Sequence, residues 1–167
     1  QHYDSSAQHD QPDIVMLQEH HLLADTTKAN DLQDWCAKRG WVFQPLSALS
    51  SNRSESGTFG GVGFLWKQHV AVMGKPAVIE EGRSASLMVH TRALGTIQII
   101  NVYFEVGKTM HSGSSIHMDH VFEAMDSTAA HTIVAGDFNT DIDDISNWLE
   151  EQGRHSVVVA APKGRTC

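Results

Sequence analysis

The stretch that decides the fold is residues 131–141, which read His-Thr-Ile-Val-Ala-Gly-Asp-Phe-Asn-Thr-Asp. It begins as a short apolar run, typical of a buried strand, and at Gly136 becomes a polar loop carrying Asp137 and Asn139. These two residues are two positions apart, so in an extended chain they point to the same side. A carboxylate beside a carboxamide can accept a proton, bind a hard cation or orient a water. The segment Asp-Phe-Asn-Thr also suits an ordinary turn with Asx-type hydrogen bonds.

Length and composition describe one ordinary globular domain. The chain has 167 residues, of which 41% are apolar and 19% charged, which is enough for a sizeable core. The net charge of -8 argues against an all-over basic surface for binding nucleic acid. It does not exclude a local contact with nucleic acid, because a bound divalent cation can coordinate a phosphate directly. The eleven histidines show no zinc-like spacing with cysteine.

Cysteine usage and hydropathy bear on the compartment. The two cysteines, Cys36 and Cys167, offer no disulfide framework, which favours a reducing compartment. No apolar run approaches the ~20 residues of a membrane span. Residues 1–11 are polar and lack the pattern of a signal peptide. We therefore expect an intracellular protein, nuclear or cytoplasmic, without a membrane span.

The first third of the chain predicts a strand, a helix and a second strand. Residues 13–17 form an apolar run that indicates a buried strand. A helix capped by Asp25 or Thr26 follows. Its apolar side chains recur at helical spacing: Ala29, Leu32, Trp35 and Cys36. Residues 41–43 predict a short strand, and the Ser-, Asn- and Gly-rich residues 46–58 predict a long exposed loop.

The rest of the chain predicts a block of strands followed by alternating helices and strands. Four or five strands without helices between them are expected, from the runs at residues 60–66, 70–72, 77–79, 84–90 and 96–104. Such a run indicates antiparallel pairing, with a hairpin between the last two. A helix over 112–130 has the apolar stripe Met118, Val121, Phe122, Met125 and Ala129. After the strand at 133–135 come a short helix with Ile145, Trp148 and Leu149, and a last strand at 157–159.

Polar side chains follow three of the predicted strands. Glu19 follows the first, Tyr103 lies near the end of the strand 96–104, and Asp137 and Asn139 follow the strand 133–135. Taken singly, Glu19 suits an exposed strand-end acid and Tyr103 an ordinary strand aromatic. If the strand ends converge, the site offers oxygen ligands, which select Mg²⁺, Ca²⁺ or Mn²⁺ over zinc. Mg²⁺ held by one or two carboxylates, with waters and a substrate phosphate, suits phosphoryl chemistry.

Five short motifs occur together: Leu17-Gln18-Glu19, Gly60-Gly61-Val62-Gly63, Glu81-Gly82-Arg83, Asn101-Val102-Tyr103 and Gly136-Asp137-Phe138-Asn139. In order and spacing they resemble the endonuclease/exonuclease/phosphatase superfamily, over nearly the whole chain. The nearest likeness is to the apurinic-type endonuclease domains of non-LTR retrotransposons. The resemblance implies one α/β domain over residues 1–167, a four-layer sandwich of two packed, mostly antiparallel sheets flanked by helices.

The resemblance also implies a role for each candidate residue. Glu19 matches the family's metal-binding Glu, which makes Mg²⁺, or Mn²⁺ in its place, the expected cofactor. Asp137 matches the Asp that orients or deprotonates the attacking water, and Asn139 matches the Asn that helps to hold the phosphate and that Asp. Tyr103 matches a Tyr near the scissile phosphate. Arg83 matches a Gly-Arg pair at a strand start, where it contacts the substrate backbone or is a plain surface charge.

This chain departs from the family pattern in three places. The first strand of the family, with its Asn, is expected before Gln1, and the closing Ser-Asp-His segment is expected after Cys167. Glu105 stands where the family usually has Pro. Loss of a residue that stabilises the transition state typically costs orders of magnitude in rate. We therefore expect weak or absent catalysis from the chain as it stands.

The sequence is compatible with three functions. The first is an Mg²⁺-dependent DNA endonuclease of retroelement type, with DNA as partner. The second is a phosphatase of small phosphate esters or phospholipids within the same superfamily. The third is a catalytically inactive domain that is retained for binding or for its structure.

Overall fold

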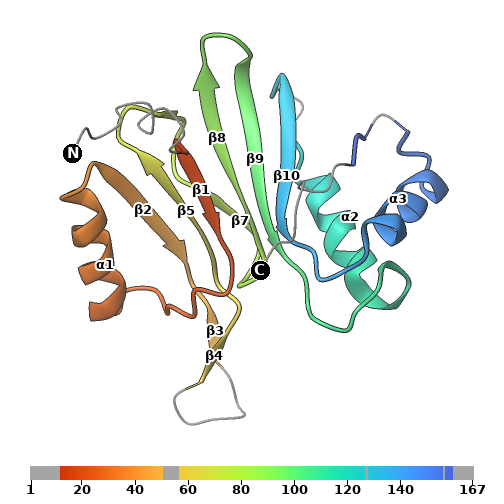
Figure 1. Cartoon of the computed structure of the whole chain (residues 1–167), viewed down its shortest axis with the longest axis horizontal. Coiled ribbons are helices and arrows are strands. Elements are labelled where there is room, and N and C mark those ends of the chain that lie inside the picture. Colours follow the sequence, from red (N-terminus) through yellow and green to blue (C-terminus); the bar gives the residue numbers. More distant parts are fainter. Residues whose placement is uncertain (1–11, 51–56, 127, 156, 160–167) are drawn as a thin grey trace, which may run out of the picture.

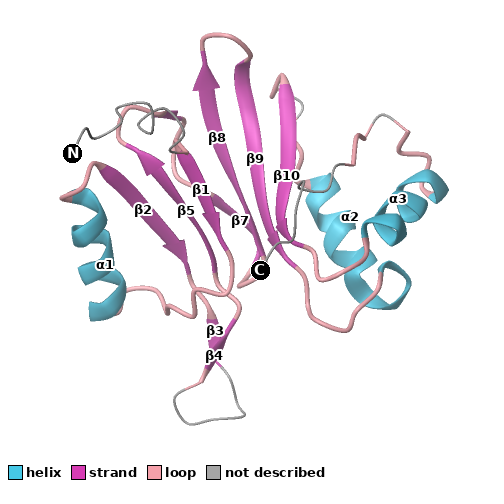
Figure 2. Cartoon of the chain, viewed as in Figure 1, coloured by secondary structure: helices cyan, strands magenta, loops and turns pink. Residues whose placement is uncertain are grey.

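The computed structural model of the chain describes residues 12–50, 57–126, 128–155 and 157–159 (Figure 1). The elements in chain order are β1 (Ile14–Leu17), α1 (Thr27–Ala37), β2 (Trp41–Leu46), β3 (Leu49–Ser50), β4 (Thr58–Phe59), β5 (Val62–Lys67), β6 (Ala71–Val72), β7 (Ala77–Glu80), β8 (Ser84–Thr91), β9 (Gly95–Tyr103), a π-type turn η2 (Met110–Ser114), α2 (Ser115–Glu123), β10 (His131–Asp137) and α3 (Ile142–Glu151). Strands and helices are mixed along the chain (Figure 2), which confirms the predicted α/β class.

The first sheet has three antiparallel strands in the order β1-β5-β2. Leu17 lies opposite Gly63, so the end of β1 meets the start of β5. The helix α1 lies along this sheet, and Cys36, Phe43 and Leu22 form a small buried cluster between them. Thr26 caps α1 as predicted, because its side chain accepts a hydrogen bond from a backbone N–H in the first turn.

The second sheet has the order β10-β9-β8-β6, and β7 also pairs with β8. β8 and β9 form the predicted hairpin, with Thr91 opposite Gly95. β10 lies parallel to β9, since η2 and α2 between them return the chain to the other end of the sheet. The last residues of β10 and β9, Asp137 and Tyr103, are register partners. The carboxyl ends of these two strands therefore coincide.

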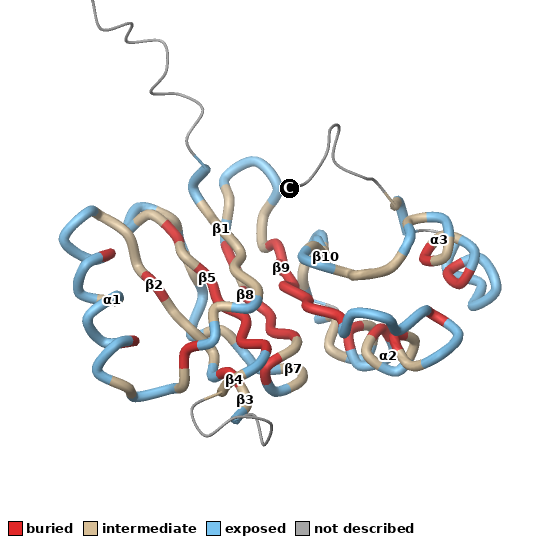
Figure 3. Tube along the Cα trace, turned by 60° about the horizontal axis from the view of Figure 1, so that its bottom comes forward, coloured by how far each residue is buried: buried red, intermediate tan, exposed pale blue. Residues whose placement is uncertain are grey.

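Side chains alternate along β9 between two cores. Ile97, Ile99 and Tyr103 belong to a central cluster with β5 and β8 residues, so this cluster lies between the two sheets. Ile100 and Val102 point the other way and belong to a cluster with α2 and α3. Apolar cores thus lie on both faces of the second sheet, with a smaller one under α1, and Figure 3 shows the buried residues running along β9 and the strands beside it.

The predicted apolar stripe of α1 is wrong in part. Ala29 and Cys36 are buried, but Leu32 is 37% and Trp35 53% exposed. The face toward the sheet instead includes Gln33, whose amide donates to a carbonyl of β2. At 3.6 residues per turn, positions 29, 33 and 36 share one face, position 32 lies at its edge and position 35 turns away from it. Apolar spacing alone did not identify which side of the helix the sheet covers.

The helix predicted over 112–130 is shorter in the structure. Gly113 has a φ of 141°, which interrupts the helical path within η2, and α2 proper ends at Glu123. Beyond it the chain turns toward the sheet, where the backbone N–H of Asp126 donates to the Gln98 side chain. Met118 and Val121 are buried as predicted, and so are the three apolar residues of α3, Ile145, Trp148 and Leu149.

Two further predictions need correction. Residues 157–159 are not a strand: within the described part of the chain they pair with no other strand, and Val158 is 90% exposed. Residues 46–58 are not simply a loop, because β3 and β4 form a short antiparallel pair there, with Leu49 opposite Phe59. Residues 51–56 and Cys167 lie outside the described residues. No helix of the described part is long and apolar enough to cross a membrane.

Candidate active site

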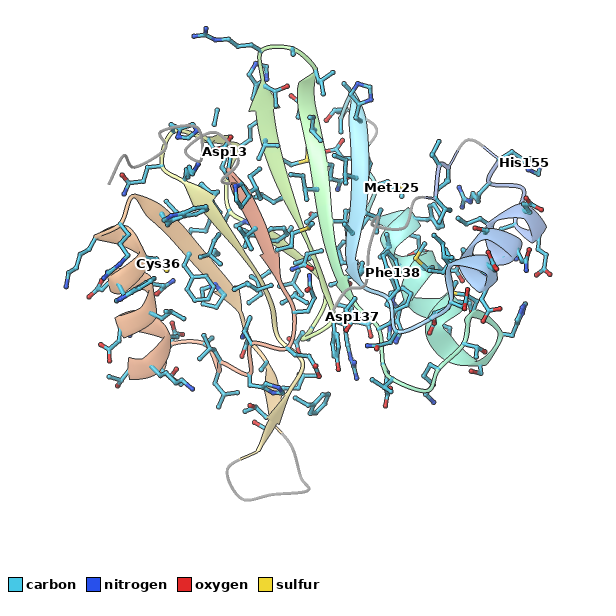
Figure 4. All side chains as sticks on the ribbon, in the orientation of Figure 1. Asp13, Cys36, Met125, Asp137, Phe138 and His155 are labelled. Carbon is cyan, nitrogen blue, oxygen red and sulfur yellow. The ribbon has the colours of Figure 1, made fainter. Side chains whose placement is uncertain are left out.

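Three strand ends meet at one edge of the two sheets. β1 ends two residues before Glu19, β9 ends at Tyr103 and β10 ends at Asp137. All three ends lie on the same side of the molecule in Figure 1, and Figure 4 shows Asp137 and Phe138 at the end of β10. Side chains of register partners on neighbouring strands point to the same face. Asp137 therefore lies beside Tyr103 on the face that meets the first sheet.

A hydrogen bond joins the two sheets at this edge. The hydroxyl of Tyr103 donates to Oε1 of Glu19. Tyr103 is only 6% exposed, and burial, with the Glu19 hydrogen bond and charge next, raises its pKa to about 12. The nearby charge of Asp137 acts in the same direction and that of Arg83 against it. Tyr103 is consequently protonated at neutral pH, where it orients the Glu19 carboxylate as a donor.

Asp137 and Asn139 form a turn as well as part of the site. The backbone N–H of Asn139 donates to Oδ1 of Asp137 at 3.1 Å, which is the Asx-type hydrogen bond of the ordinary turn interpretation. The Asn139 side-chain amide donates to the carbonyl of Phe104 at 2.8 Å. The N–H of Phe104 in turn donates to the Asp137 carbonyl at 2.8 Å. These three bonds hold the loop after β10 against the end of β9.

Gly136 allows this close approach. It has a φ of 148°, and a Cβ at this position would lie 2.0 Å from the carbonyl oxygen of Val102. Any side chain there would push β10 away from β9. The glycine before Asp137 is thus required for the parallel pair to reach its last register position.

Arg83 lies inside the site rather than on a free surface. Its side chain is only 13% exposed, and Nη2 lies 3.7 Å from Oε2 of Glu105. The guanidinium carbon is 5.2 Å from the ring centroid of Tyr103 and 5.6 Å from that of Phe59. The backbone carbonyl of Arg83 accepts a hydrogen bond from the Tyr103 N–H at 2.8 Å. The Arg side chain is therefore held against the tyrosine that contacts Glu19.

Asn101 and Gln18 position the site, although the sequence analysis gave these two motif residues no role. Asn101 is 0% exposed and its side-chain amide donates to the carbonyls of Leu17 at 2.8 Å and Gly63 at 2.9 Å. Its Oδ1 accepts from Gln18 Nε2 at 2.5 Å. One β9 side chain thus ties together β1 and β5 of the other sheet. The available signal was an Asn within the apolar run Ile99–Val102, since a buried amide needs partners.

His20 is a structural residue of the same edge. Its Nδ1 accepts from the Leu22 N–H at 3.0 Å, and its Nε2 donates to the Val62 carbonyl at 2.9 Å. This arrangement requires the neutral ring, and burial lowers its pKa. A Cβ on Gly61 would lie 2.6 Å from Cε1 of His20. The Gly-Gly motif therefore makes room for this imidazole.

An apolar cavity lies beside the site. It has a volume of about 830 Å³ and opens between β10, α2 and α3. Figure 4 labels three of its lining residues, Met125, Asp137 and Phe138. Asp137 and Asn139 border it, but the other walls are mostly apolar. Such walls offer few partners to a charged group, so the cavity does not extend the polar group formed by Glu19, Tyr103 and Asp137.

Residues 4–161 match the model of the Endonuclease/Exonuclease/phosphatase family. The chain belongs to this family. Its members are phosphoesterase hydrolases. No curated protein sequence matches the chain.

Solved structures with the family's fold match at low identity. A humanized D. rerio TDP2 carrying 14 mutations matches with 16% identity and a TM-score of 0.55, over 86% of this chain and 59% of that one. ANGEL2, a 2′,3′-cyclic phosphatase, matches with 11% identity and a TM-score of 0.55, over 84% and 43%. The endonuclease domain of TRAS1, a telomere-specific non-LTR retrotransposon, matches with 16% identity and a TM-score of 0.45, over 84% and 73%. This family member thus spans 59% and 43% of the first two structures.

The carboxylates of Glu19 and Asp137 supply oxygen atoms, the ligand type that a hard cation prefers. Among the described residues no group of three or more His, Cys, Asp or Glu side chains is placed to share a metal ion. Glu19 and Asp137 are both exposed at the common edge. Mg²⁺ commonly takes one or two carboxylates and fills its other positions with waters and phosphate oxygens. Glu19, with its second oxygen free of the Tyr103 bond, would be the protein ligand.

Proposed function

We propose that this chain provides the metal-binding and water-positioning residues of an Mg²⁺-dependent phosphodiesterase that acts on DNA. The observation that supports this best is the arrangement of Glu19, Tyr103 and Asp137. The hydrogen bond between Tyr103 and Glu19 crosses the two sheets, and Asp137 is the register partner of Tyr103. The Glu19 carboxylate, oriented by Tyr103, and the Asp137 carboxylate thus lie at the same edge. Carboxylates in this position can bind a hard cation and accept a proton from water, which supports hydrolysis of a phosphate ester.

Each residue would have a separate task. Glu19 binds the cation, for which Mn²⁺ can replace Mg²⁺, and Tyr103 holds the Glu19 carboxylate in place. Asp137 orients the attacking water and accepts its proton, while the Asn139 N–H fixes the Asp137 carboxylate. Arg83 contacts the substrate backbone. When bound, Mg²⁺ would offset the negative charge of the phosphate oxygens.

The motifs that resemble retroelement-type endonuclease domains support DNA as the substrate. We expect slow turnover from the present chain, because the family motifs nominate none of its histidines to stabilise the phosphate. His20 is the nearest in sequence to Glu19, but both of its ring nitrogens bond to backbone groups. A residue that stabilises the transition state typically contributes orders of magnitude in rate.

Nicking of supercoiled plasmid DNA tests the proposal. We expect slow, Mg²⁺-dependent nicking that falls by about 100-fold or more in Glu19→Gln and in Asp137→Asn, because each change removes a charge that the reaction needs. Glu150→Gln, an exposed carboxylate of α3, is the matched control and should nick at the wild-type rate. Nicking that persists in both site variants, or that needs no divalent cation, would contradict the proposal.

Calorimetric titration with Mg²⁺ tests the metal site without turnover. We expect binding by the wild-type chain and its loss in Glu19→Gln. If Mg²⁺ causes no thermal shift and Asp137→Ala has wild-type stability, the third function, an inactive binding or structural domain, is favoured instead.

A phosphatase of small phosphate esters or phospholipids is the second candidate. The net charge of -8 favours it, since an acidic surface repels a polyanion such as DNA. Phosphate release from small esters that exceeds plasmid nicking under the same Mg²⁺ conditions would select this candidate.

A further inference from the structure

Phe59 presents an exposed aromatic ring next to the candidate site. It is the last residue of β4 and is 39% exposed. The ring lies over the guanidinium of Arg83, which lies against the ring of Tyr103 as well. The stack Phe59–Arg83–Tyr103 therefore runs from the surface to the tyrosine that contacts Glu19. An exposed phenyl ring forgoes much of the hydrophobic stabilisation that burial would provide.

Backbone contacts hold β4, and with it Phe59, in place. Thr58 donates its hydroxyl to the His21 carbonyl at 2.9 Å, and Nδ1 of His21 lies 3.0 Å from the Thr58 carbonyl oxygen. On the other side of Phe59, the Gly60 carbonyl accepts from the His21 N–H at 3.2 Å. The Gly61 N–H donates to the Gly82 carbonyl at 2.9 Å, beside Arg83. The ring is thus fixed relative to both the Glu19 loop and the Arg83 turn.

We propose that the outer face of Phe59 stacks with an unpaired nucleobase of a polynucleotide, close to the phosphate held by Glu19 and Asp137. This deepens the proposed function and rests on it. A fixed aromatic face with a cation beside it suits single strands, because every base has a π-face and the backbone between bases is anionic. The Arg83 guanidinium carbon lies 5.6 Å from the Phe59 ring centroid and 5.2 Å from that of Tyr103, so a strand that stacks on Phe59 passes next to the site.

Binding of a short single-stranded DNA, measured by fluorescence anisotropy in EDTA, tests the stacking without turnover. We expect Phe59→Leu, which keeps apolar bulk but removes the π-face, to raise Kd by about 5- to 20-fold. Phe59→Trp should bind at least as tightly as the wild type. Trp35→Leu is the matched control, since Trp35 is an exposed ring beneath Arg39, which follows the end of α1. It should leave Kd unchanged.

An oligonucleotide with abasic sites and a duplex of the same sequence identify what the ring contacts. The effect of Phe59→Leu should disappear on the abasic strand and be small on the duplex. An equal Kd for wild type and Phe59→Leu on the normal strand would overturn the inference, and so would an equal loss on the abasic strand or on the duplex. Thermal unfolding of Phe59→Leu checks that the variant is folded.

The outcomes separate this inference from the proposed function. If the chain nicks plasmid with the expected Glu19 dependence but Phe59→Leu leaves single-strand binding unchanged, the inference is wrong and the function stands. If Phe59→Leu weakens single-strand binding as expected but nicking is absent or independent of Glu19 and Asp137, the function fails and the stacking site remains.

Discussion

Two of the predicted site residues, Glu19 and Asn139, lie in the left-handed backbone region, with φ values of 50° and 45°. This conformation costs about 1–3 kcal/mol in a non-glycine residue and persists only where the surroundings enforce it. Next to Glu19, the backbone N–H groups of His20 and His21 donate to the carbonyls of Gly61 and Gly60 and hold the loop. At Asn139 the enforcing contacts are the pair of bonds to Phe104 and Asp137. Backbone strain therefore accompanies the orientation of the groups that the proposed chemistry uses.

His20 makes the free energy of unfolding depend on pH. The folded chain needs its neutral ring, and burial lowers its pKa below the ordinary value of 6.5. The unfolded chain therefore takes up a proton at higher pH than the folded chain. The free energy of unfolding should fall as the pH drops below 6.5 toward the lowered pKa, and this contribution should be absent above 6.5.

Urea unfolding at about pH 5 and about pH 7.5 measures this dependence. In His20→Gln the difference between the two pH values should be smaller than in the wild type. His131→Gln changes an exposed histidine of β10 and should keep the wild-type difference. An unchanged difference in His20→Gln would contradict the assignment.

At the scale of elements, the parallel pair of β9 and β10 brings Tyr103 and Asp137 together. The strand, helix and strand at 96–104, 112–130 and 133–135 were visible as changes of hydrophobic period, and a helix between two paired strands favours parallel pairing. The sequence did not show how closely the two backbones approach each other at the end of this strand pair. This approach depends on Gly136, whose missing side chain leaves room for the Val102 carbonyl.

Gly136→Ala should destabilise the chain by about 2–4 kcal/mol, because the new Cβ would meet the Val102 carbonyl and the backbone conformation is unfavourable for Ala. Gly40→Ala is the matched control: Gly40 has a φ of 79°, but nothing lies within 4 Å of an added Cβ. It should cost only about 1–2 kcal/mol. Chemical denaturation of both variants measures the difference, and equal losses would show that the contact with Val102 is unimportant.

At the scale of the whole molecule, Asn101 holds the two sheets together beneath the site. Asn101→Leu should lower the free energy of unfolding by about 2–4 kcal/mol, because it leaves the buried carbonyls of Leu17 and Gly63 without this donor. Chemical denaturation measures this loss. Since Leu17 and Gln18 lead directly to Glu19, Mg²⁺ binding should weaken as well.

Gln98→Met is the matched control for Asn101→Leu. Gln98 is 3% exposed and also on β9, but its amide bonds to the Ala124 carbonyl and the Asp126 N–H at the end of α2. It should lose comparable stability and keep wild-type Mg²⁺ affinity in calorimetric titration. An equal effect of both variants on Mg²⁺ affinity would mean that Asn101 acts on the site only through general stability.

Much of the fold followed from local patterns, whereas the site followed only in part. Hydrophobic periods predicted β1, β8, β9, β10 and α3, because each buries one face or both. They failed for the stripe of α1, where the sheet covers Gln33 in place of Trp35, and for residues 157–159. The motifs nominated Glu19, Tyr103 and Asp137, which the structure brings to one edge. The roles of these residues and of Mg²⁺ remain predictions.

By itself the sequence determined the α/β class, the order of most strands and helices, and the family to which the chain belongs. These properties depend on local periodicity and on short motifs, and both can be identified from the sequence alone. Only the tertiary structure decided that Tyr103 bonds to Glu19, that Asn101 joins the sheets, and that Arg83 lies between two rings. Those contacts join residues far apart in sequence, so they exist only once the two sheets have packed together.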